Sequence, residues 1–413
     1  MTNFAEFGLE PSLLESLKKM NYDIPTPIQA EAIPVALQGK DILGSASTGT
    51  GKTAAFSIPL LNHLMTTPKG LALILTPTRE LATQIFNVMR QMVPNPQQIR
   101  GVLLIGGEPM GPQFQDLRRS PRIIIGTPGR VKDHLERGSL KLNDCNFLVL
   151  DETDRMLHMG FEEQLNSIVD ALPSVHQTLL FSATLPQQIV KLSQKYLIDP
   201  VRIAIGSTTA VAAKIKQEVV HTTAGHKYQD LLKQLESREG SIIVFVKTKR
   251  GADRLSEKLT EESHSASAIH GDLPQMKRDR VIRGFRDRKN RILVATDVAA
   301  RGLDIPHIEH VINYDLPQCP EDYIHRIGRT GRAGAEGSAL CLLEPSDQRK
   351  WRAIELMLNP NAKPSHAKAE TGPWQRRSRP SANPNARDGF MPHAKKSFRS
   401  QKNVSRPHQN HAR

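Results

Sequence analysis

The amino-acid sequence predicts an α/β protein with two tandem domains, each built around a parallel β-sheet. Short runs rich in Val, Ile and Leu alternate with amphipathic helical patterns along most of the chain, which is typical of βα units. A stretch of small residues interrupts this alternation once, and the alternation then resumes. A chain of 413 residues with 38% hydrophobic content is also too long for one ordinary core. We therefore expect two globular domains with short attachments.

The first half contains five apolar runs that we expect to form strands of the first sheet. Each run ends in small or polar residues that precede a helical pattern. In chain order the runs are GLALILTPTRE over 70–80, RGVLLIGG over 100–107, RIIIGTPGR over 122–130, FLVLDETD over 147–154 and QTLLFSAT over 177–184. The pattern returns as GSIIVFVKTK over 240–249, NRILVATDVAARG over 290–302 and HVINYDLP over 310–317. This repetition indicates a second sheet of similar construction.

These patterns divide the chain into four parts. We expect a first domain over 1–205, a linker of small residues, GSTTAVAAK, over 206–214, and a second domain over 215–358. From residue 359 to 413 the periodicity disappears, and the composition turns to Pro, Ser, Asn, His, Lys and Arg. This tail holds twelve Lys or Arg residues against two acids, Glu370 and Asp388. Such a segment is expected to be disordered and basic.

Net charge and cysteine content narrow the classes of function. The net charge of +14 favours a polyanionic partner, either a nucleic acid or an anionic surface. The three cysteines, Cys145, Cys319 and Cys341, are far apart and lack metal-ligand or redox spacing, so we expect reduced thiols in a cytoplasmic protein. The N-terminus lacks the features of a signal peptide, and no apolar run is long enough to cross a bilayer. The chain is therefore expected to be soluble.

The strongest local motif is ASTGTGKT over 46–53, which follows the apolar run DILGS and precedes the helical pattern AAFSIPLLNHL. In this context small residues let backbone N–H groups surround phosphates at a helix N-terminus. Lys52 would neutralise phosphate charge and Thr53 would reach Mg²⁺. Ala46 replaces the first glycine of the general pattern. The residues expected to bind the phosphates are Ala46, Ser47, Thr48, Gly49, Thr50, Gly51, Lys52 and Thr53.

A second strand of the same domain is expected to deliver acidic residues to this loop. The run FLVLDE ends in Asp151 and Glu152, and a phosphate-binding loop of this kind requires an acid at the carboxyl end of a neighbouring strand. Asp151 would hold Mg²⁺ through its water shell. Glu152 would orient and polarise the water that attacks the γ-phosphate.

The chain resembles the DEAD-box ATP-dependent RNA helicase family of superfamily 2 over residues 4 to about 345. Eleven stretches occur in the family's order: YDIPTPIQ (22–29), ASTGTGKT (46–53), PTRELA (77–82), GG (106–107), TPGR (127–130), DETD (151–154), SAT (182–184), IIVFVKTK (242–249), HGDLPQMKRDR (270–280), ATDVAARGLD (295–304) and HRIGRTGR (325–332). The resemblance implies two RecA-like domains and an RNA-dependent ATPase that uses ATP and Mg²⁺ to separate RNA duplexes locally or to remodel ribonucleoprotein.

The resemblance also implies further nucleotide-binding residues. The adenine would lie against Phe4 and near Gln29, whose amide can both donate and accept. Arg329 and Arg332 would reach the γ-phosphate from the second domain, because a planar, permanently charged guanidinium stabilises charge on the phosphoryl oxygens. Asp304 would meet the ribose hydroxyls. Since the second half has no Gly-Lys-Thr loop, ATP would bind between the domains.

A further set of residues resembles the loops that clamp a single RNA strand by its phosphates and sugars. Such contacts carry little information about the base sequence. A preference for RNA over DNA would depend on 2′-hydroxyl contacts. The set is Pro77, Thr78, Arg79, Gly106, Gly107, Thr127, Pro128, Gly129 and Arg130 in the first half, with Thr248, Gly271 and Thr296 in the second. The residues expected to couple nucleotide state to domain closure are Asp154, Ser182, Thr184, His325 and Arg326, and an RNA-binding role stays open for Arg326.

Two departures from the family pattern are visible. Thr153 stands where the family has alanine, which adds a hydroxyl but leaves the three acids intact. Tyr22 replaces the more frequent phenylalanine and keeps the ring. The short N-terminal lead and the lack of large insertions resemble compact bacterial members, such as the RhlE-like group. The family also suggests a monomer that joins ribosomal or RNA-decay assemblies.

Two other functions remain open at this point. One is a DNA-directed motor of the same two-domain construction, which a comparison of ATPase stimulation by RNA and DNA would distinguish. The other is a non-enzymatic RNA-binding or annealing protein that acts through its basic tail. Normal strand annealing without ATP hydrolysis would favour that alternative.

Overall fold

The computed structural model describes residues 3–46, 49–183, 187–205, 215–300, 305, 307–331 and 336–359. The expected linker over 206–214 and the tail from residue 360 onward lie outside these ranges. Five candidate site residues also lie outside them: Ser47, Thr48, Thr184, Asp304 and Arg332.

The first part of the chain forms a seven-stranded sheet in the order β3-β4-β2-β5-β6-β1-β7, and all its paired strands are parallel. The strands are β1 (Ile42–Ala46), β2 (Leu71–Leu75), β3 (Gly101–Leu104), β4 (Ile123–Gly126), β5 (Cys145–Leu150), β6 (Gln177–Ser182) and β7 (Val201–Ile205). Strand β2 has the sequence LALIL and is buried throughout, as expected for a parallel strand that is covered on both faces.

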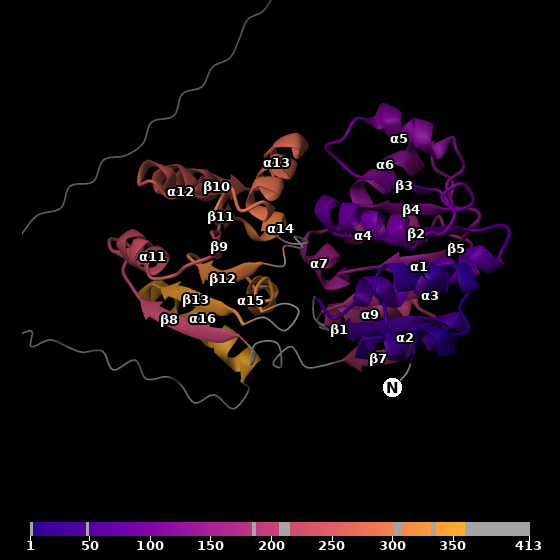
Figure 1. Ribbon diagram of the computed structural model, residues 1–413, viewed down its shortest axis with the longest axis horizontal. Coiled ribbons are helices and arrows are strands. Elements are labelled where there is room, and N and C mark those ends of the chain that lie inside the picture. Colours follow the sequence, from indigo (N-terminus) through magenta and orange to yellow (C-terminus); the bar gives the residue numbers. More distant parts are fainter. Residues whose placement is uncertain are drawn as a thin grey trace, which may run out of the picture. The chain divides into compact units, whose positions relative to one another are not determined.

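Helices lie on both faces of this sheet (Figure 1). One face packs against the 3₁₀ helix η1 (Phe4–Phe7) and the helices α1 (Pro11–Lys19), α2 (Pro27–Leu37), α3 (Lys52–Thr66) and α4 (Arg79–Met92). The other face packs against α6 (Pro128–Glu136), α7 (Thr153–His158), α8 (Glu162–Val169) and α9 (Gln187–Tyr196). Helix α5 (Met110–Leu117) follows the edge strand β3. Along β2, Ala72 and Ile74 join the first of these cores, and Leu73 joins the second, because successive side chains point to opposite faces.

The second part forms a six-stranded parallel sheet in the order β10-β11-β9-β12-β13-β8. Its strands are β8 (Lys216–His221), β9 (Ser241–Phe245), β10 (Ala266–Ile269), β11 (Ile292–Ala295), β12 (Ile308–Asn313) and β13 (Ser338–Leu343). Its helical segments are α11 (Lys227–Glu236), α12 (Lys249–Glu261), α13 (Gln275–Arg286), α14 (Asp297–Ala300), α15 (Pro320–Ile327), η3 (Pro345–Asp347) and α16 (Gln348–Leu358). Side chains of α11 and α12 pack on one face, and those of α13, α15 and α16 pack on the other. The prediction of two parallel-sheet α/β units is therefore confirmed.

Parallel strands bring the candidate residues to one edge of each sheet. In parallel sheets the carboxyl ends of all strands lie at the same edge, where ligands usually bind. The loop that begins at Ala46, the acids after Leu150 and the segment after Leu75 all follow such ends. Within the described residues, no helix combines the length and hydrophobicity needed to span a bilayer.

Candidate active site

The loop that is expected to bind phosphate joins the end of β1 to the start of α3. Gly49 and Gly51 have φ values of 81° and 95°, a left-handed conformation that glycine adopts without steric cost. Helix α3 begins at Lys52, whose side chain is only 7% exposed. Its ammonium group donates a 2.8 Å hydrogen bond to the Ala46 carbonyl. The lysine therefore closes the loop on itself, and its charge lies at the helix N-terminus.

Gln29 connects this loop to the segment that precedes α2. Its Oε1 accepts from the Thr26 backbone N–H at 2.9 Å, and its Nε2 donates to the Gly51 carbonyl at 3.1 Å. A side chain at Gly51 would collide with this amide. Both ends of the Gln29 amide thus contact the protein itself, and its predicted contact with adenine stays a prediction.

Phe4, the other residue expected at the adenine, is 2% exposed and belongs to the first core. Its ring makes edge contacts with Phe7 and Tyr22, with centroids 5.9 and 6.1 Å away. The Tyr22 substitution therefore keeps an aromatic contact with Phe4. Whether Phe4 also contacts adenine stays a prediction.

The two catalytic candidates Asp151 and Glu152 follow β5 and are 3% and 4% exposed. Burial raises the pKa of Asp151 to about 6, and the nearby charge of Lys52 opposes this rise. Burial would also raise the pKa of Glu152, but neighbouring cations, Arg155 first, outweigh it and hold that pKa at about 2. Adjacent carboxylates with such different pKa values can take different roles.

Arg155 is a site residue that the sequence analysis missed. It lies on α7, is 2% exposed, and forms an ion pair with Glu152. Glu152 itself has a left-handed backbone conformation with φ of 51°, which is uncommon for a residue with a long side chain. The i to i+3 spacing within DETDR could have indicated this pair.

Thr153, the departure from the family pattern, is fully buried. Its hydroxyl lies 3.2 Å from both the Leu150 and the Phe181 carbonyl oxygens. The added hydroxyl therefore has acceptors on the ends of β5 and β6, so it introduces no unsatisfied polar group at the acidic motif.

Two residues of α15 and its C-terminal side lie near the acids. His325 Nε2 is 3.9 Å from the Asp154 carboxylate, and both side chains are buried. Arg329 is 4% exposed, donates to the His325 carbonyl at 3.1 Å, and contributes positive charge that lowers the pKa of Glu152. The structure thus brings predicted residues of the second unit to the acidic motif of the first.

Arg326 has a different environment. Its guanidinium binds both oxygens of Asp297 at 2.6 and 2.8 Å, and it donates to the Asn313 side chain and the Asp315 carbonyl. It also lies over the Phe245 ring, with 4.8 Å between the guanidinium carbon and the ring centroid. These contacts tie α15 to β9, β12 and α14 within the second unit, so its open RNA-binding role gains no support.

The expected RNA-binding residues of the first unit form one cluster at the carboxyl ends of β2, β3 and β4. Thr78 caps α4 by accepting from the Leu81 N–H at 3.3 Å. The Arg79 side chain lies against Gly106 and Gly107, where any side chain at Gly107 would collide with it. Burial, followed by the nearby Arg278 charge, lowers the pKa of Arg79.

The TPGR segment completes this cluster. Pro128 begins α6 directly after Thr127, and the Arg130 guanidinium donates to the Glu108 carbonyl at 3.0 Å. A cavity of about 370 Å³ lies among these segments. Its lining includes Pro77, Thr78, Arg79, Gly106, Thr127, Gly129 and Arg130, together with Gly271 and Arg278.

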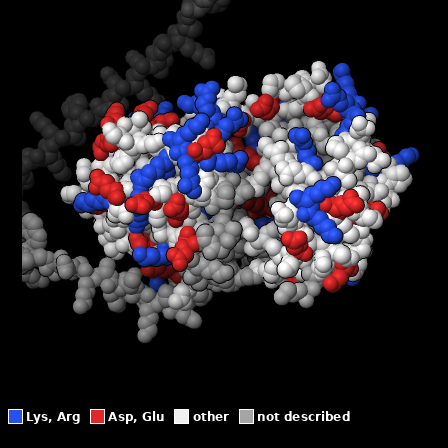
Figure 2. All heavy atoms as spheres, viewed as in Figure 1, with Lys and Arg blue, Asp and Glu red and all other residues white. Residues whose placement is uncertain are grey.

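A threonine side chain caps a helix in the second unit, as it does in the first. Thr248 accepts from the Gly251 N–H at 3.0 Å and caps α12 after β9, as Thr78 caps α4 after β2. Gly271 and Thr296 follow the ends of β10 and β11. Figure 2 shows Lys and Arg side chains gathered over α12 and α13 on the viewed face. This surface suits a polyanion.

Sequence reasoning also missed a contact between this cluster and α13. Arg278 Nη2 lies 2.6 Å from Glu80 Oε1, and the side chains are 6% and 7% exposed. That oxygen accepts no hydrogen bond among the described residues, so the contact is chiefly electrostatic. The Arg79 guanidinium donates to the Gln275 side chain at 3.4 Å. Glu80 and Arg278 were within the quoted motifs, but a single sequence gives no signal that they meet.

Comparison with known proteins identifies the family of this chain. The model of the DEAD/DEAH box helicase family matches residues 26–192, and that of the helicase conserved C-terminal domain matches 226–334. CshA of Bacillus cereus, named a DEAD-box ATP-dependent RNA helicase, is 44% identical over 357 residues, which cover 86% of this chain and 68% of that protein. The Bacillus subtilis CshA is 42% identical over 354 residues, covering 85% and 72%.

Solved structures lead to the same family. Dbp5 of S. cerevisiae bound to RNA and ADP BeF3 has a TM-score of 0.77 and 33% identity, covering 87% of this chain and 94% of that one. Mss116 bound to ssRNA and UDP-BeF has a TM-score of 0.79 and 29% identity, covering 88% and 79%. The fold, the site and these relatives together show that the chain belongs to the DEAD-box ATP-dependent RNA helicase family.

Proposed function

We propose that this RNA helicase hydrolyses ATP with a set of residues drawn from both of its α/β units. The observation that carries the proposal is the convergence of Lys52, Asp151 and Glu152 at the carboxyl edge of the first sheet, with the charge of Arg329 close enough to affect Glu152. Lys52 releases the Ala46 carbonyl and binds the β- and γ-phosphates. Glu152, held ionised by its neighbours, orients the attacking water. Arg329 stabilises charge on the γ-phosphoryl oxygens, and Arg332 is assigned the same role from the resemblance alone.

Mg²⁺ fits the residues of this site. Asp151 and Thr53 offer hard oxygen ligands beside the loop, and Mg²⁺ commonly uses one or two protein oxygens together with water and phosphate. Among the described residues, no group of three or more His, Cys, Asp or Glu side chains could hold a metal by itself. When bound, the ion would neutralise phosphate charge. Asp151 must then be ionised, which the neighbouring Lys52 charge favours.

We assign the RNA path to the cluster formed by the PTRELA, GG and TPGR segments, joined by Thr248, Gly271 and Thr296. The cluster offers backbone N–H groups, hydroxyls and two arginines, Arg79 and Arg130, which suit phosphates and sugars rather than base edges. Binding would therefore depend little on RNA sequence. Asp154 and His325, with Ser182 and Thr184, would couple RNA and nucleotide binding to closure of the two units.

The remaining assignments extend this proposal. We propose the domain limits 1–205 and 215–358, a linker over 206–214, and a tail over 359–413 that tethers RNA. The adenine site is assigned to Phe4 and Gln29, and the ribose site to Asp304. As the sequence led us to expect, we also propose that this helicase is monomeric and cytoplasmic and that it joins ribosomal or RNA-decay assemblies. Membership of the RhlE-like group stays a prediction.

ATP turnover by the purified chain tests the proposal against both alternatives. We expect Mg²⁺-dependent ATPase activity that single-stranded RNA stimulates strongly and DNA of equal length does not. Equal stimulation by DNA would favour a DNA-directed motor. Strand annealing with no ATP turnover would favour a non-enzymatic RNA-binding protein.

A further inference from the structure

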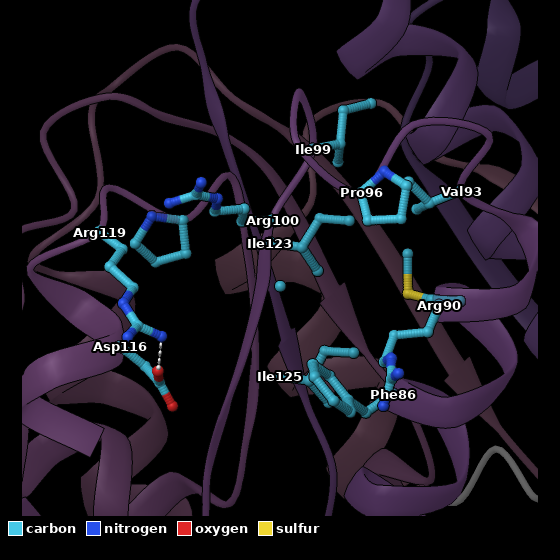
Figure 3. Close-up of a pocket in the computed structure, with 13 residues that line it drawn as sticks. Phe86, Arg90, Val93, Pro96, Ile99, Arg100, Asp116, Arg119, Ile123 and Ile125 are labelled. Atoms are coloured by element: carbon cyan, nitrogen blue, oxygen red, sulfur yellow. Dashed lines mark hydrogen bonds and ion pairs between the residues drawn. The ribbon is translucent and has the colours of Figure 1, made fainter. Parts of the chain in front are cut away.

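A second cavity lies in the first unit, and we propose that it binds an acidic segment of a partner protein through a large apolar side chain. The cavity measures about 780 Å³ and lies beside the edge strand β3, between the C-terminal part of α4 and the end of α5 (Figure 3). Among the residues that the structure describes, none of those assigned above to nucleotide, RNA or coupling lines it. The cavity is therefore distinct from the sites assigned above.

Gly101 at the start of β3 lets the Phe86 ring pack closely over the strand, because a Cβ atom at this position would be 3.0 Å from that ring. The buried side chains of Ile123 and Ile125 on β4 line the cavity beside Phe86 (Figure 3). These side chains already belong to the core of the first unit or pack against it. The cavity walls are thus preformed, which reduces the entropic cost of binding.

The charges around the cavity select an anionic occupant. Arg90 lies on one side of the apolar lining, and Arg100 and Arg119 lie on the other (Figure 3). Asp116, the one acid among the described residues of the lining, pairs with Arg119 at 3.2 Å, but these side chains are 50% and 64% exposed. Such an exposed pair is weak. The chain's own basic tail would be repelled, because it carries twelve Lys or Arg against two acids.

The apolar lining favours a protein segment over a nucleic acid. Proteins that bind single strands stack bases on aromatic rings, whereas the described lining holds one ring, Phe86. The Arg90 guanidinium carbon lies 6.0 Å from the centroid of that ring. The other apolar walls are aliphatic and include Met89, Val93 and Ile99. A leucine, methionine or phenylalanine side chain flanked by Asp or Glu matches both the walls and the rim.

Peptide selection on the full chain tests this proposal. Random peptides of about twelve residues are displayed on phage, selected on the wild type, and counter-selected on Arg90→Glu/Arg100→Glu. A matched control, Arg118→Glu/Lys141→Glu, changes the net charge equally at two exposed residues outside the lining. We expect enriched peptides with an apolar residue among acids. A labelled synthetic copy should bind the pocket variant at least about tenfold more weakly than the wild type and the control.

Four results would overturn the proposal. The first two are the absence of peptides that prefer the wild type and the enrichment of basic peptides. The third is an equal loss of peptide affinity in the control variant. The fourth is stronger peptide binding once residues 359–413 are removed, which would make the tail the occupant. A fifth measurement separates the macromolecule classes. If the pocket variant binds a labelled single-stranded RNA about tenfold more weakly while the control does not, the cavity belongs to the RNA path instead. RNA-dependent ATPase activity and melting temperature should remain unchanged in both variants.

Discussion

Arg278 of α13 and Glu80 of α4 form a buried ion pair, with 2.6 Å between Nη2 and Oε1, although the two helices belong to different sheets. Glu80 lies next to Arg79, and Arg79 itself donates to Gln275 on α13. The pair therefore joins α13 to the segment that we assign to RNA phosphates. Opposite charges that are this deeply buried depend strongly on each other, because either one alone would lose its hydration without compensation.

We expect Arg278→Met to lower RNA-stimulated ATPase activity by about tenfold or more. The substitution leaves Glu80 without its cation, and loss of one partner of a buried pair costs on the order of 3–5 kcal/mol. ATP binding to the first unit should change little. Steady-state turnover measured against RNA concentration checks this, with Arg280→Met at an exposed position of the same helix as the control.

A double-mutant cycle decides whether the ion pair itself is responsible. Glu80→Gln combined with Arg278→Met removes both charges, so the double variant should recover part of the activity lost in Arg278→Met. Losses that simply add would show that the two residues act separately.

The sequence predicted the buried parts of the fold better than the edges. Apolar runs such as LALIL at β2 identify a strand covered on both faces. Strand β8, KQEVVH, lies at a sheet edge with mostly exposed residues, and β10, ASAI, is short and built mainly from small side chains. Neither has a strong apolar pattern, so neither was predicted. Strand β13, SALCLL, is apolar and buried and was simply overlooked.

The candidate site shows the same division. Lys52, Asp151 and Glu152 could be placed together because each lies beside the carboxyl end of a predicted strand. Gln275 and Arg278 could not be found in this way, since their contacts depend on which helices meet, whereas the local spacing of Glu152 and Arg155 could have indicated that pair. The sequence also gave no signal that the Gln29 amide donates a hydrogen bond to the Gly51 carbonyl.

Gln29→Glu is expected to raise KM for ATP by about tenfold and to reduce the preference for ATP over GTP. The variant keeps an acceptor for the Thr26 N–H but places an oxygen against the Gly51 carbonyl, and loss of such a buried hydrogen bond costs about 1–3 kcal/mol. Competition between ATP and GTP in the ATPase assay measures both effects, with exposed Gln38→Glu as the control. Equal increases in KM for both nucleotides would mean that Gln29 only positions the loop.

Lys52→Ala and Glu152→Gln should fail at different steps. The first removes the ammonium group that we assign to the phosphates, so nucleotide binding or turnover should be lost. The second keeps the size of the side chain but removes its negative charge, so ATP and RNA should remain bound together in a stalled closed state. Filter binding of labelled RNA with and without ATP distinguishes the two variants. Normal steady-state turnover by Glu152→Gln would refute the role assigned to this carboxylate.

Arg329→Ala is expected to reduce maximal ATPase turnover by a factor on the order of a thousand, because an arginine that acts on the transferred phosphoryl group stabilises chiefly the transition state. Nucleotide affinity should change far less, since Lys52 and the loop remain. Turnover at saturating RNA and equilibrium binding of a fluorescent nucleotide separate the two effects. An unchanged maximal rate would exclude Arg329 from the reaction.

Removal of residues 359–413 should weaken RNA binding without slowing the chemistry. The tail combines Arg376, Arg377 and Arg379 with dispersed aromatic residues such as Trp374 and Phe390. Such a segment can hold RNA through counterion release and stacking. We expect the truncated chain to show lower RNA affinity, a flatter dependence of affinity on salt, and a higher RNA concentration for half-maximal ATPase activity.

The maximal ATPase rate of the truncated chain should match that of the full chain, because the residues that we assign to catalysis all lie before residue 359. A variant with the five residues Arg376, Arg377, Arg379, Lys395 and Lys396 changed to Gln provides the matched control, since it keeps the length of the tail and removes charge alone. If this variant behaves like the truncated chain, the positive charge of the tail is responsible for RNA tethering. Each phosphate contact that is lost reduces the salt dependence of RNA affinity by a similar increment. Equal RNA affinity and salt dependence in all three proteins would rule out tethering. A loss of maximal rate at saturating RNA would instead place the tail in the catalytic machinery.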